Sequence, residues 1–159
     1  MKKILISACL AGDLVRYDGK RVPLKDVLLS QWSRKGRLVK VCPEVSGGLK
    51  IPRHQIQLVE GNGRDVLEGK ARAVDIVGND VTLPFIKGAE YALSLAEKYD
   101  IKIAILKEKS PSCGVHRIYD GHFVSNLIPG FGVTAAILMQ DGITVFSENE
   151  LDQIPRDYR

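Results

Sequence analysis

Three cysteines are the side chains in this sequence whose type and spacing most directly suggest chemistry. Each of them ends or closely follows an apolar run that is typical of a β-strand. If these strands are parallel neighbours, their carboxyl ends lie along one edge of one sheet, where open α/β folds place ligands. We therefore expect Cys9, Cys42 and Cys113 to meet at that edge. The three segments are KKILISAC at 2–9, RLVKVCP at 37–43 and IKIAILKEKSPSCG at 101–114.

These three thiols could bind a metal, act as nucleophiles or simply pack as small apolar side chains. Packing explains each cysteine, taken singly, about as well as reactivity does, because free cysteine is among the most buried residue types. A structural zinc ion normally takes four ligands that include a closely spaced C-x-x-C pair, and this chain contains no such pair. Three thiolates from three loops can instead hold three irons of a cubane cluster and leave the fourth iron open to substrate. The spacing suggests a cluster and leaves the other two interpretations open.

Polar side chains beside two of the cysteines could take part in such a site. Glu44 lies two residues after Cys42, and a carboxylate beside a cluster can act as a general acid or base once burial raises its pKa. Ser110 and Ser112 belong to the SPSC segment that ends at Cys113. Either hydroxyl could donate a hydrogen bond to a cluster sulfur or position a substrate. A solvated glutamate and a serine that caps a turn are the plainer interpretations of these residues.

Glycines and charged residues elsewhere in the chain give weaker indications. Gly47 and Gly48 permit a positive φ or a close backbone approach, and Lys107 and Glu108 stand at the end of a strand-like run. The run Gly130–Gly132 before an apolar helix could present backbone N–H groups to an anion. The full dinucleotide-binding fingerprint is absent from this run. Other residues that could contact a polar ligand are Arg16, Tyr17 and Arg53.

Composition limits the class of protein. The 159 residues are 45% hydrophobic and 26% charged, which is ordinary for one globular domain, here predicted over 1–159. No stretch approaches the roughly 18 to 20 apolar residues of a membrane span. A net charge of +4 and a pI near 9.0 favour anionic partners only mildly, because the basic residues are spread along the chain. The apolar run 4–11 meets the turn signal Gly12–Asp13 and predicts a first strand of a cytoplasmic protein and not a signal peptide. A cytoplasmic chain keeps its thiols reduced, so the odd count of three cysteines makes a disulfide framework unlikely.

Strand-like and helix-like segments alternate along the chain and must position the residues described above. This alternation predicts an α/β fold, a three-layer sandwich with a Rossmann-like, mostly parallel sheet and helices on both faces. Residues 61–80 are rich in Gly, Asn and Asp and indicate irregular structure, with at most a short strand near 73–77. The predicted strands are 4–8, 37–41, 101–106 and 143–146, and the predicted helices are 26–36, 80–99 and 133–140.

Local signals predict some of the element ends. Ser147 and Glu150 are spaced as a capping box for a short final helix. The segment 15–23 has a polar turn at Asp18–Gly19 between short apolar ends. The side chains that can cap the helix over 80–99 are Asn79, Asp80 and Thr82.

Six short motifs, taken together and in order, resemble the thiouracil desulfidase family. The resemblance extends from Ile4 to about Leu151. Each motif alone is unspecific, whereas their combination is specific. One departure is Ala11, where family members commonly have a second leucine after SACL. The motifs are SACL, RYDGK at 16–20, VCPEVSGGL at 41–49, KEKSPSCG at 107–114, IYDG at 118–121 and GVTAA at 132–136.

The resemblance implies an iron–sulfur enzyme that removes sulfur from thiolated pyrimidines such as 2-thiouracil, 4-thiouracil or thiouridine. It implies a [4Fe-4S] cluster held by Cys9, Cys42 and Cys113, with an open iron that takes the substrate sulfur as a Lewis acid. Glu44 would help water to add to the thiocarbonyl carbon, and Ser110 would assist by hydrogen bonding. Hydrosulfide would leave without net redox change. The residues expected to bind substrate are Ser112, Lys107, Gly47 and Gly48.

The substrate and the competing functions stay open at this level. Free base, nucleoside and tRNA are all compatible with the sequence, and the basic pI tilts slightly toward a phosphate-bearing substrate. A nucleotide- or RNA-binding module with structurally packed cysteines is the main alternative. A thiol enzyme with one cysteine of low pKa is another. The sequence does not determine the oligomeric state.

Overall fold

The structure is a computed structural model of the chain, and it describes residues 1–13, 16–19 and 26–159. The predicted turn at Asp18–Gly19 is present, because the Gly19 N–H donates to the Arg16 carbonyl at 2.8 Å. The apolar ends predicted on either side of this turn, with Lys20 of the RYDGK motif, lie outside the described residues. Within the described ranges, no helix has the length and apolar character needed to cross a bilayer.

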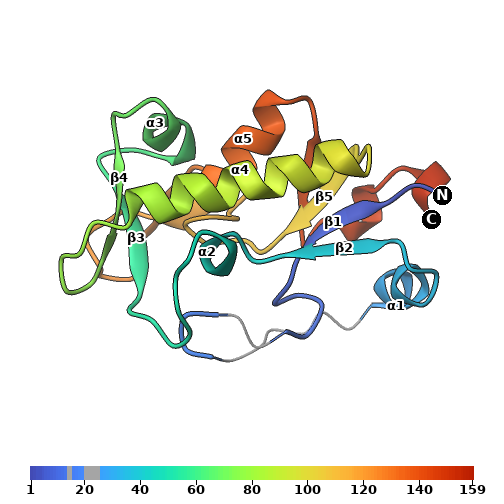
Figure 1. The fold of residues 1–159 in the computed structure, drawn as a ribbon, viewed down its shortest axis with the longest axis horizontal. Coiled ribbons are helices and arrows are strands. Elements are labelled where there is room, and N and C mark those ends of the chain that lie inside the picture. Colours follow the sequence, from blue (N-terminus) through green and yellow to red (C-terminus); the bar gives the residue numbers. More distant parts are fainter. Residues whose placement is uncertain (14–15, 20–25) are drawn as a thin grey trace.

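Four parallel strands form the centre of the fold (Figure 1). They are β1 (Ile4–Ser7), β2 (Leu38–Val41), β5 (Ile103–Leu106) and β8 (Thr144–Ser147). Their order in the sheet is β2, β1, β5, β8. The register pairs Ser7 with Val41 and Leu106 with Ser147. All four strands therefore end at one edge, and the cysteine-bearing segments follow three of them.

Helices cover both faces of this sheet, as predicted. One face packs against α4 (Thr82–Lys98) and α5 (Val133–Gln140), and the other against α1 (Val27–Arg34) and the 3₁₀ helices η1 (Leu151–Gln153) and η2 (Arg156–Tyr158). Side chains alternate between the two faces along a strand. Leu5 joins the core beneath α4 and α5, whereas Ile4 and Ile6 join the core that contains Trp32 of α1. The predicted three-layer α/β architecture is confirmed.

Of the three predicted caps, Asp80 acts at the start of α4. Its carboxylate accepts the Thr82 N–H at 2.9 Å. The Thr82 hydroxyl instead accepts the N–H of Ala73 at 3.0 Å. This second bond ties the first turn of α4 to the neighbouring strand, so the helix start is fixed from both sides.

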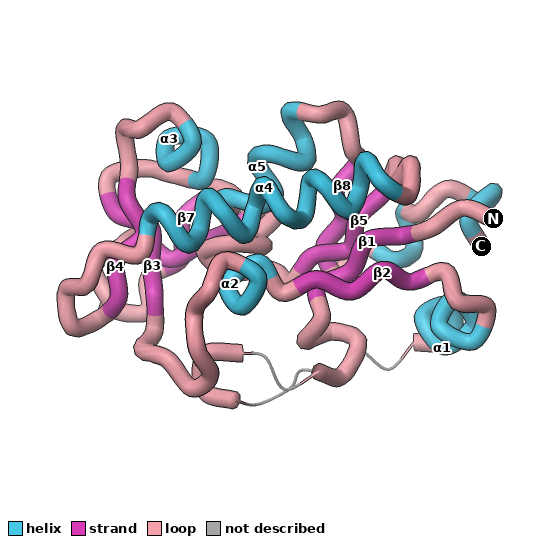
Figure 2. The backbone as a smooth tube through the Cα atoms, in the orientation of Figure 1, coloured by secondary structure: helices cyan, strands magenta, loops and turns pink. Residues whose placement is uncertain are grey.

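A smaller β-unit lies at the end of the molecule opposite α1 and the two chain ends (Figure 2). It consists of the antiparallel pairs β3 (Ile56–Val59) with β4 (Arg72–Asp75) and β6 (Arg117–Tyr119) with β7 (Leu127–Pro129), and of the helix α3 (Gly63–Leu67). The prediction of irregular structure over 61–80 was therefore wrong for α3. The Asn62 side chain accepts from the Asp65 N–H at 3.3 Å and the Asp65 carboxylate accepts from the Asn62 N–H at 2.9 Å. This capping box could have identified the helix from the sequence.

The capping box predicted for the short final helix is only half formed. The Glu150 carboxylate accepts the Ser147 N–H at 3.0 Å, as a capping box requires. The Ser147 hydroxyl, however, accepts the Asn149 N–H at 3.2 Å, so the reciprocal bond is not made. The short helix that follows is the 3₁₀ helix η1.

Candidate metal centre

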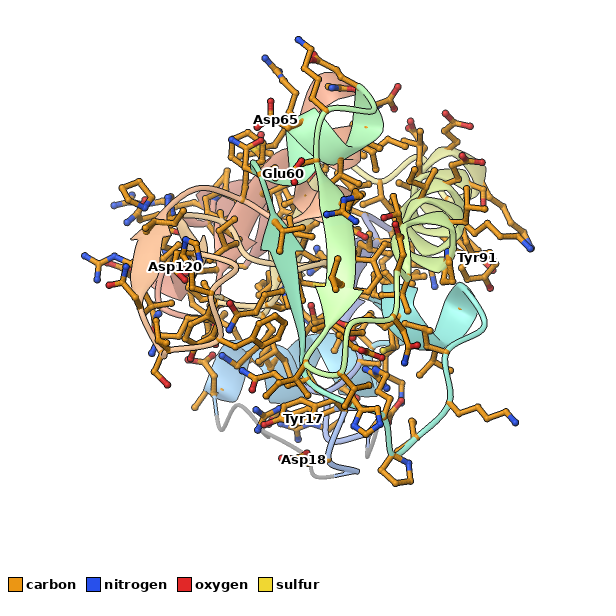
Figure 3. The ribbon with its side chains drawn as sticks, turned by 90° about the vertical axis from the view of Figure 1, so that its left-hand side faces the viewer. Tyr17, Asp18, Glu60, Asp65, Tyr91 and Asp120 are labelled. Atoms are coloured by element: carbon orange, nitrogen blue, oxygen red, sulfur yellow. The ribbon has the colours of Figure 1, made fainter. Side chains whose placement is uncertain are left out.

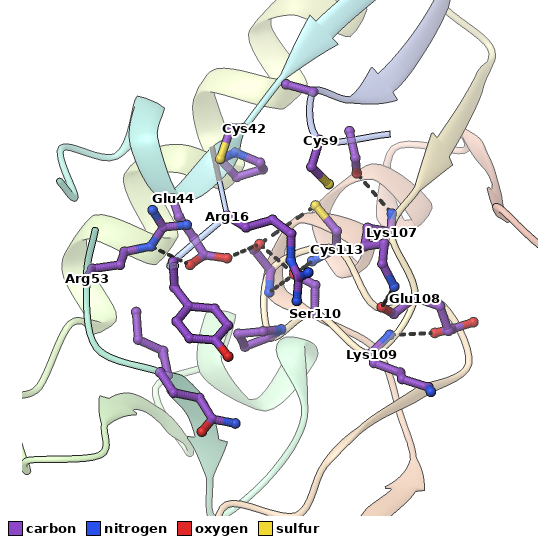
Figure 4. Close-up of a pocket in the computed structure, with 18 of the residues that line it drawn as sticks. Cys9, Arg16, Cys42, Glu44, Arg53, Lys107, Glu108, Lys109, Ser110 and Cys113 are labelled. Atoms are coloured by element: carbon purple, nitrogen blue, oxygen red, sulfur yellow. Dashed lines mark hydrogen bonds and ion pairs between the residues drawn. The ribbon is translucent and has the colours of Figure 1, made fainter. Parts of the chain in front are cut away.

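A cavity of about 180 Å³ lies at the carboxyl edge of the parallel sheet and is lined by all three cysteines. Figure 4 shows Cys9, Cys42 and Cys113 approaching one another from three different segments. Cys9 and Cys113 are buried, and Cys42 is partly buried. The predicted meeting of the three thiols at one sheet edge is therefore present in the structure.

Cys9 is held in the turn that follows β1. The Ala8 N–H donates to the Val41 carbonyl at 2.8 Å and so continues the pairing of β1 with β2. The Leu10 N–H then donates to the Ser7 carbonyl at 3.0 Å, which closes the turn around Cys9. The sheet thus fixes the first thiol directly.

Cys42 is the N-cap residue of the short helix α2 (Pro43–Ser46). Two glycines allow α2 to lie directly against α4. A Cβ added at Gly88 would stand 1.8 Å from the Pro43 carbonyl oxygen, and one at Gly47 would stand 1.9 Å from the Pro84 carbonyl oxygen. Because a helix of four residues is not stable alone, this contact with α4 is what sets the position of Cys42 and of Glu44 behind it.

Cys113 lies in a loop that docks on the first turn of α5. The Thr134 N–H donates to the Ser112 carbonyl at 2.8 Å, and the Val133 N–H donates to the Pro111 carbonyl at 3.1 Å. A Cβ on Gly132 would stand 2.4 Å from the Ser112 carbonyl carbon, so the loop reaches the helix only because this residue is glycine. The N–H groups expected to bind an anion at this glycine-rich turn are therefore used inside the protein, which corrects that prediction.

Ser110 shapes the same loop from within. Its hydroxyl oxygen accepts the N–H of Ser112 at 3.2 Å and the N–H of Cys113 at 3.0 Å. Its carbonyl accepts the Gly114 N–H at 2.8 Å. Ser110 is thus a turn-capping residue, which is the plainer of its two interpretations from sequence.

Glu108 is a buried carboxylate that fixes the far side of the cysteine loop. Its Oε1 accepts the N–H groups of Val115, His116 and Arg117 at 2.7, 2.9 and 3.1 Å. The Glu108 N–H donates in turn to Glu148 at 2.7 Å. This role could not be distinguished from that of a surface glutamate by sequence, because the partners of Glu108 are backbone groups several residues away.

Lys107 lines the cavity next to the thiols, as its prediction as a substrate-binding residue requires. Its ammonium group lies 2.9 Å from the carboxylate of Glu148, and both side chains are mostly buried. It also donates to the Glu108 carbonyl at 3.0 Å. The pairing partner Glu148 was missed from the sequence because it follows β8, which carries no cysteine.

Glu44 faces the cavity with a partner on each carboxylate oxygen. Arg53 Nε donates to Oε1 at 3.0 Å, and Ser112 Oγ donates to Oε2 at 2.9 Å. Ser112 Oγ also lies 3.0 Å from Ser110 Oγ and 3.7 Å from Cys113 Sγ. Since Ser110 Oγ already accepts two N–H groups, its proton points to Ser112, and the Ser112 proton points to Glu44. Ser112 is therefore the hydroxyl that contacts the carboxylate.

The two glycines predicted to bind substrate lie away from the cavity. Gly47 and Gly48 do not belong to the cavity lining, and Gly47 packs against α4. Their assignment to substrate binding stays a prediction without support from this geometry. Tyr119, Gln55 and Ile56, which were not predicted as site residues, also line the cavity.

The thiols are not those of a cysteine nucleophile. Burial, with a smaller contribution from the neighbouring thiols, raises the pKa of Cys9 to about 11 and that of Cys113 to about 12. Burial also raises the pKa of Cys42. A reactive cysteine needs a lowered pKa, so this environment disfavours the thiol-enzyme alternative. Thiols of high pKa ionise when a metal binds them, and metal binding then releases their protons.

The donor set fits an iron–sulfur cluster better than a single ion. Thiolates are the protein ligands of such clusters. In the part of the chain that the structure describes, no three His, Cys, Asp or Glu side chains are grouped closely enough to hold one metal ion. The three cysteines that line one cavity could supply three thiolate ligands to a cubane cluster, with one iron left open.

The fold and the site together define an α/β protein with a three-cysteine centre beside a paired glutamate. The family model described as 2-thiouracil desulfurase matches residues 4–150. The chain belongs to this family, in agreement with the resemblance found in its motifs.

Two relatives cover almost the whole chain. The uncharacterised protein YbbK of Bacillus subtilis (strain 168) is 42% identical over 151 residues, which are 95% of this chain and 99% of that protein. The solved structure named [4Fe-4S]-dependent thiouracil desulfidase TudS has 42% sequence identity and a TM-score of 0.88. The match covers 97% of this chain and 95% of that chain.

Proposed function

We propose that this protein is a [4Fe-4S]-dependent desulfidase that converts thiolated pyrimidines to their oxo forms and releases hydrosulfide. The observation that carries the proposal is the cavity in which three cysteines from three strand ends meet the carboxylate of Glu44. Membership of the 2-thiouracil desulfurase family and the similarity to TudS support it. The packed-cysteine, RNA-binding alternative does not explain why all three thiols line one cavity.

The cluster would be held by Cys9, Cys42 and Cys113, which leaves one iron without a protein ligand. When bound, the cluster supplies that iron as a Lewis acid for the sulfur of the substrate. The protein's contribution is to fix three sulfurs on backbone that is held by β1, α2 and the loop docked on α5.

The remaining chemistry belongs to the protein's own side chains. Water adds to the thiocarbonyl carbon, the C–S bond breaks, and the products are a carbonyl and hydrosulfide, so no electrons are gained or lost. Glu44 takes the proton from the attacking water as general base. Ser112, which donates to Glu44 Oε2, holds the carboxylate in place during this step. Lys107, which is paired with Glu148, lines the cavity beside the thiols.

The experiment compares anaerobically purified wild-type protein with Cys113→Ala. We expect about four irons per chain and visible thiolate-to-iron absorption in the wild type, both lost in the variant. Sulfide release is then measured with 2-thiouracil, 4-thiouridine and a thiolated tRNA as separate substrates, which also tells base, nucleoside and RNA apart. Wild-type protein that binds no iron after reconstitution would refute the cluster, and iron-loaded protein without sulfide release would refute the activity.

A further inference from the structure

Arg53 forms an ion pair with Glu44 in the wall of the cavity. Its Nε lies 3.0 Å from Glu44 Oε1, and only 9% of the Arg53 side chain and 12% of the Glu44 side chain are exposed to solvent. A pair so little exposed is screened far less by salt and water than a surface pair. Removal of either partner leaves a charge in a poorly hydrated place. The geometry of Glu44 therefore depends on Arg53.

The arginine is itself anchored at its backbone and at its side chain. The Arg53 N–H donates to the Tyr17 carbonyl at 2.7 Å, and its Nη1 donates to the Lys50 carbonyl at 3.4 Å. Figure 3 shows Tyr17 and Asp18 close to one end of the β3–β4 pair, and Figure 4 shows Arg53 reaching from the loop before β3 to Glu44. A planar guanidinium held in this way presents its donors in a fixed direction.

Arg53 and Ser112 hold Glu44 from opposite sides. Arg53 donates a hydrogen bond to Oε1, and Ser112, the neighbour of Cys113, donates one to Oε2. The plane of the carboxylate is therefore fixed by two donors on two separate segments. Without Arg53, the flexible glutamate side chain would keep a single partner and could turn away from the cysteines.

We propose that Arg53 is a positioning residue that fixes the carboxylate of Glu44 for the reaction, acting through Glu44 and not on the substrate. The inference rests on the proposed desulfidase function for its kinetic consequence. Its geometric part, the coupling of Arg53 to Glu44, stands on the contacts alone. If a positioning group is lost and the reacting residue shifts by about 1 Å, the rate can fall by about 100-fold.

The test uses iron-loaded Arg53→Gln, Arg53→Lys, Glu44→Gln and the double variant Arg53→Gln/Glu44→Gln, with Arg72→Gln as matched control. Arg72 also pairs with a glutamate, Glu60, but its side chain is 53% exposed. We expect Arg53→Gln to lower kcat about 10- to 100-fold with KM unchanged. Arg53→Lys should recover part of kcat, because lysine keeps a donor but lacks the planar fork. The double variant should be no slower than Glu44→Gln, and Arg72→Gln should match wild type.

Iron content and the visible spectrum of each variant give readouts that do not depend on turnover. They should be unchanged in Arg53→Gln, because Arg53 acts on Glu44. A double-mutant cycle on the unfolding equilibrium should also show Arg53 and Glu44 coupled by about twofold to a hundredfold. If iron-loaded wild type releases no sulfide but this coupling is present, the proposed function fails and the Arg53–Glu44 contact survives.

Four outcomes would overturn the inference. An unchanged kcat in Arg53→Gln would show that the ion pair between Arg53 and Glu44 does not contribute to turnover. A rise in KM alone would make Arg53 a substrate-binding residue. A double variant slower than Glu44→Gln would show that Arg53 acts independently of the carboxylate. Loss of iron in Arg53→Gln would make its role that of supporting the cluster site.

Discussion

Gly88 of α4 offers a test of how the helical layer sets the position of the thiols. A Cβ at this position would lie 1.8 Å from the Pro43 carbonyl oxygen, and α2 and α4 would have to separate by about 1.2 Å for that contact to reach 3.0 Å. Overpacking of this kind costs about 1–3 kcal/mol, against about 1 kcal/mol gained by replacing a helical glycine with alanine. We therefore expect Gly88→Ala to lower the free energy of unfolding by about 1 kcal/mol.

The larger consequence concerns α2, which carries Cys42 and Glu44 at its start. A shift of about 1 Å in this helix should lower sulfide release by about 100-fold and weaken iron retention. The assays are chemical unfolding, iron content after gel filtration and turnover of 2-thiouracil. Lys87→Ala, which changes the exposed neighbour of Gly88 to the same residue, is the matched control. A Gly88→Ala protein that is as stable, as iron-rich and as active as wild type would refute this account.

Two further predictions follow from contacts described above. Ser112→Ala should abolish most turnover while iron is retained, because it removes the hydroxyl bound to Glu44. Ser110→Ala should mainly loosen the loop, lower stability by about 0.5–2 kcal/mol and speed the loss of iron in air. The reverse pattern would show that Ser110 is the active hydroxyl. The hydrogen bond from Thr82 lowers the pKa of Asp80 below 3.8, so its stabilisation is present above the unfolded value and lost as pH falls through the folded value. Asp80→Asn should therefore unfold more readily than wild type at pH 7 and equally at pH values well below 3.8, and a constant difference across the acid range would contradict this.

Much of the site could be predicted because it follows from backbone geometry of the simplest kind. Cysteines at the ends of three apolar strands must come together if the strands are parallel and adjacent. The sheet order places β1 between β2 and β5, so Cys9, Cys42 and Cys113 follow three consecutive strands. The apolar run that opens after Gly130 and Gly132 likewise predicted α5 with its observed ends, Val133 and Gln140.

The parts that could not be predicted depend on contacts between segments far apart in sequence. The strand β3 belongs to the core but contains the polar Gln57, so its sequence does not indicate a buried strand. Its side chain is buried because its Oε1 accepts the N–H groups of Gly121 and Phe123 at 3.0 and 3.2 Å. The sequence indicates only that Arg53 is a loop residue that could contact a polar ligand. Its pairing with Glu44 could not be foreseen, because the segment that carries it returns to the cavity only in the folded chain.

The position of the thiols is set as much by the helical layer as by the sheet. Cys9 follows β1 directly, but Cys42 depends on the glycine contact between α2 and α4, and Cys113 depends on carbonyls bound to the first turn of α5. The helices α4 and α5 lie on the same face of the sheet. Substitutions in that layer should therefore impair iron retention and stability together. Substitutions in the core around Trp32 on the other face should lower stability first, because Cys9 is the one thiol whose packing belongs to that side.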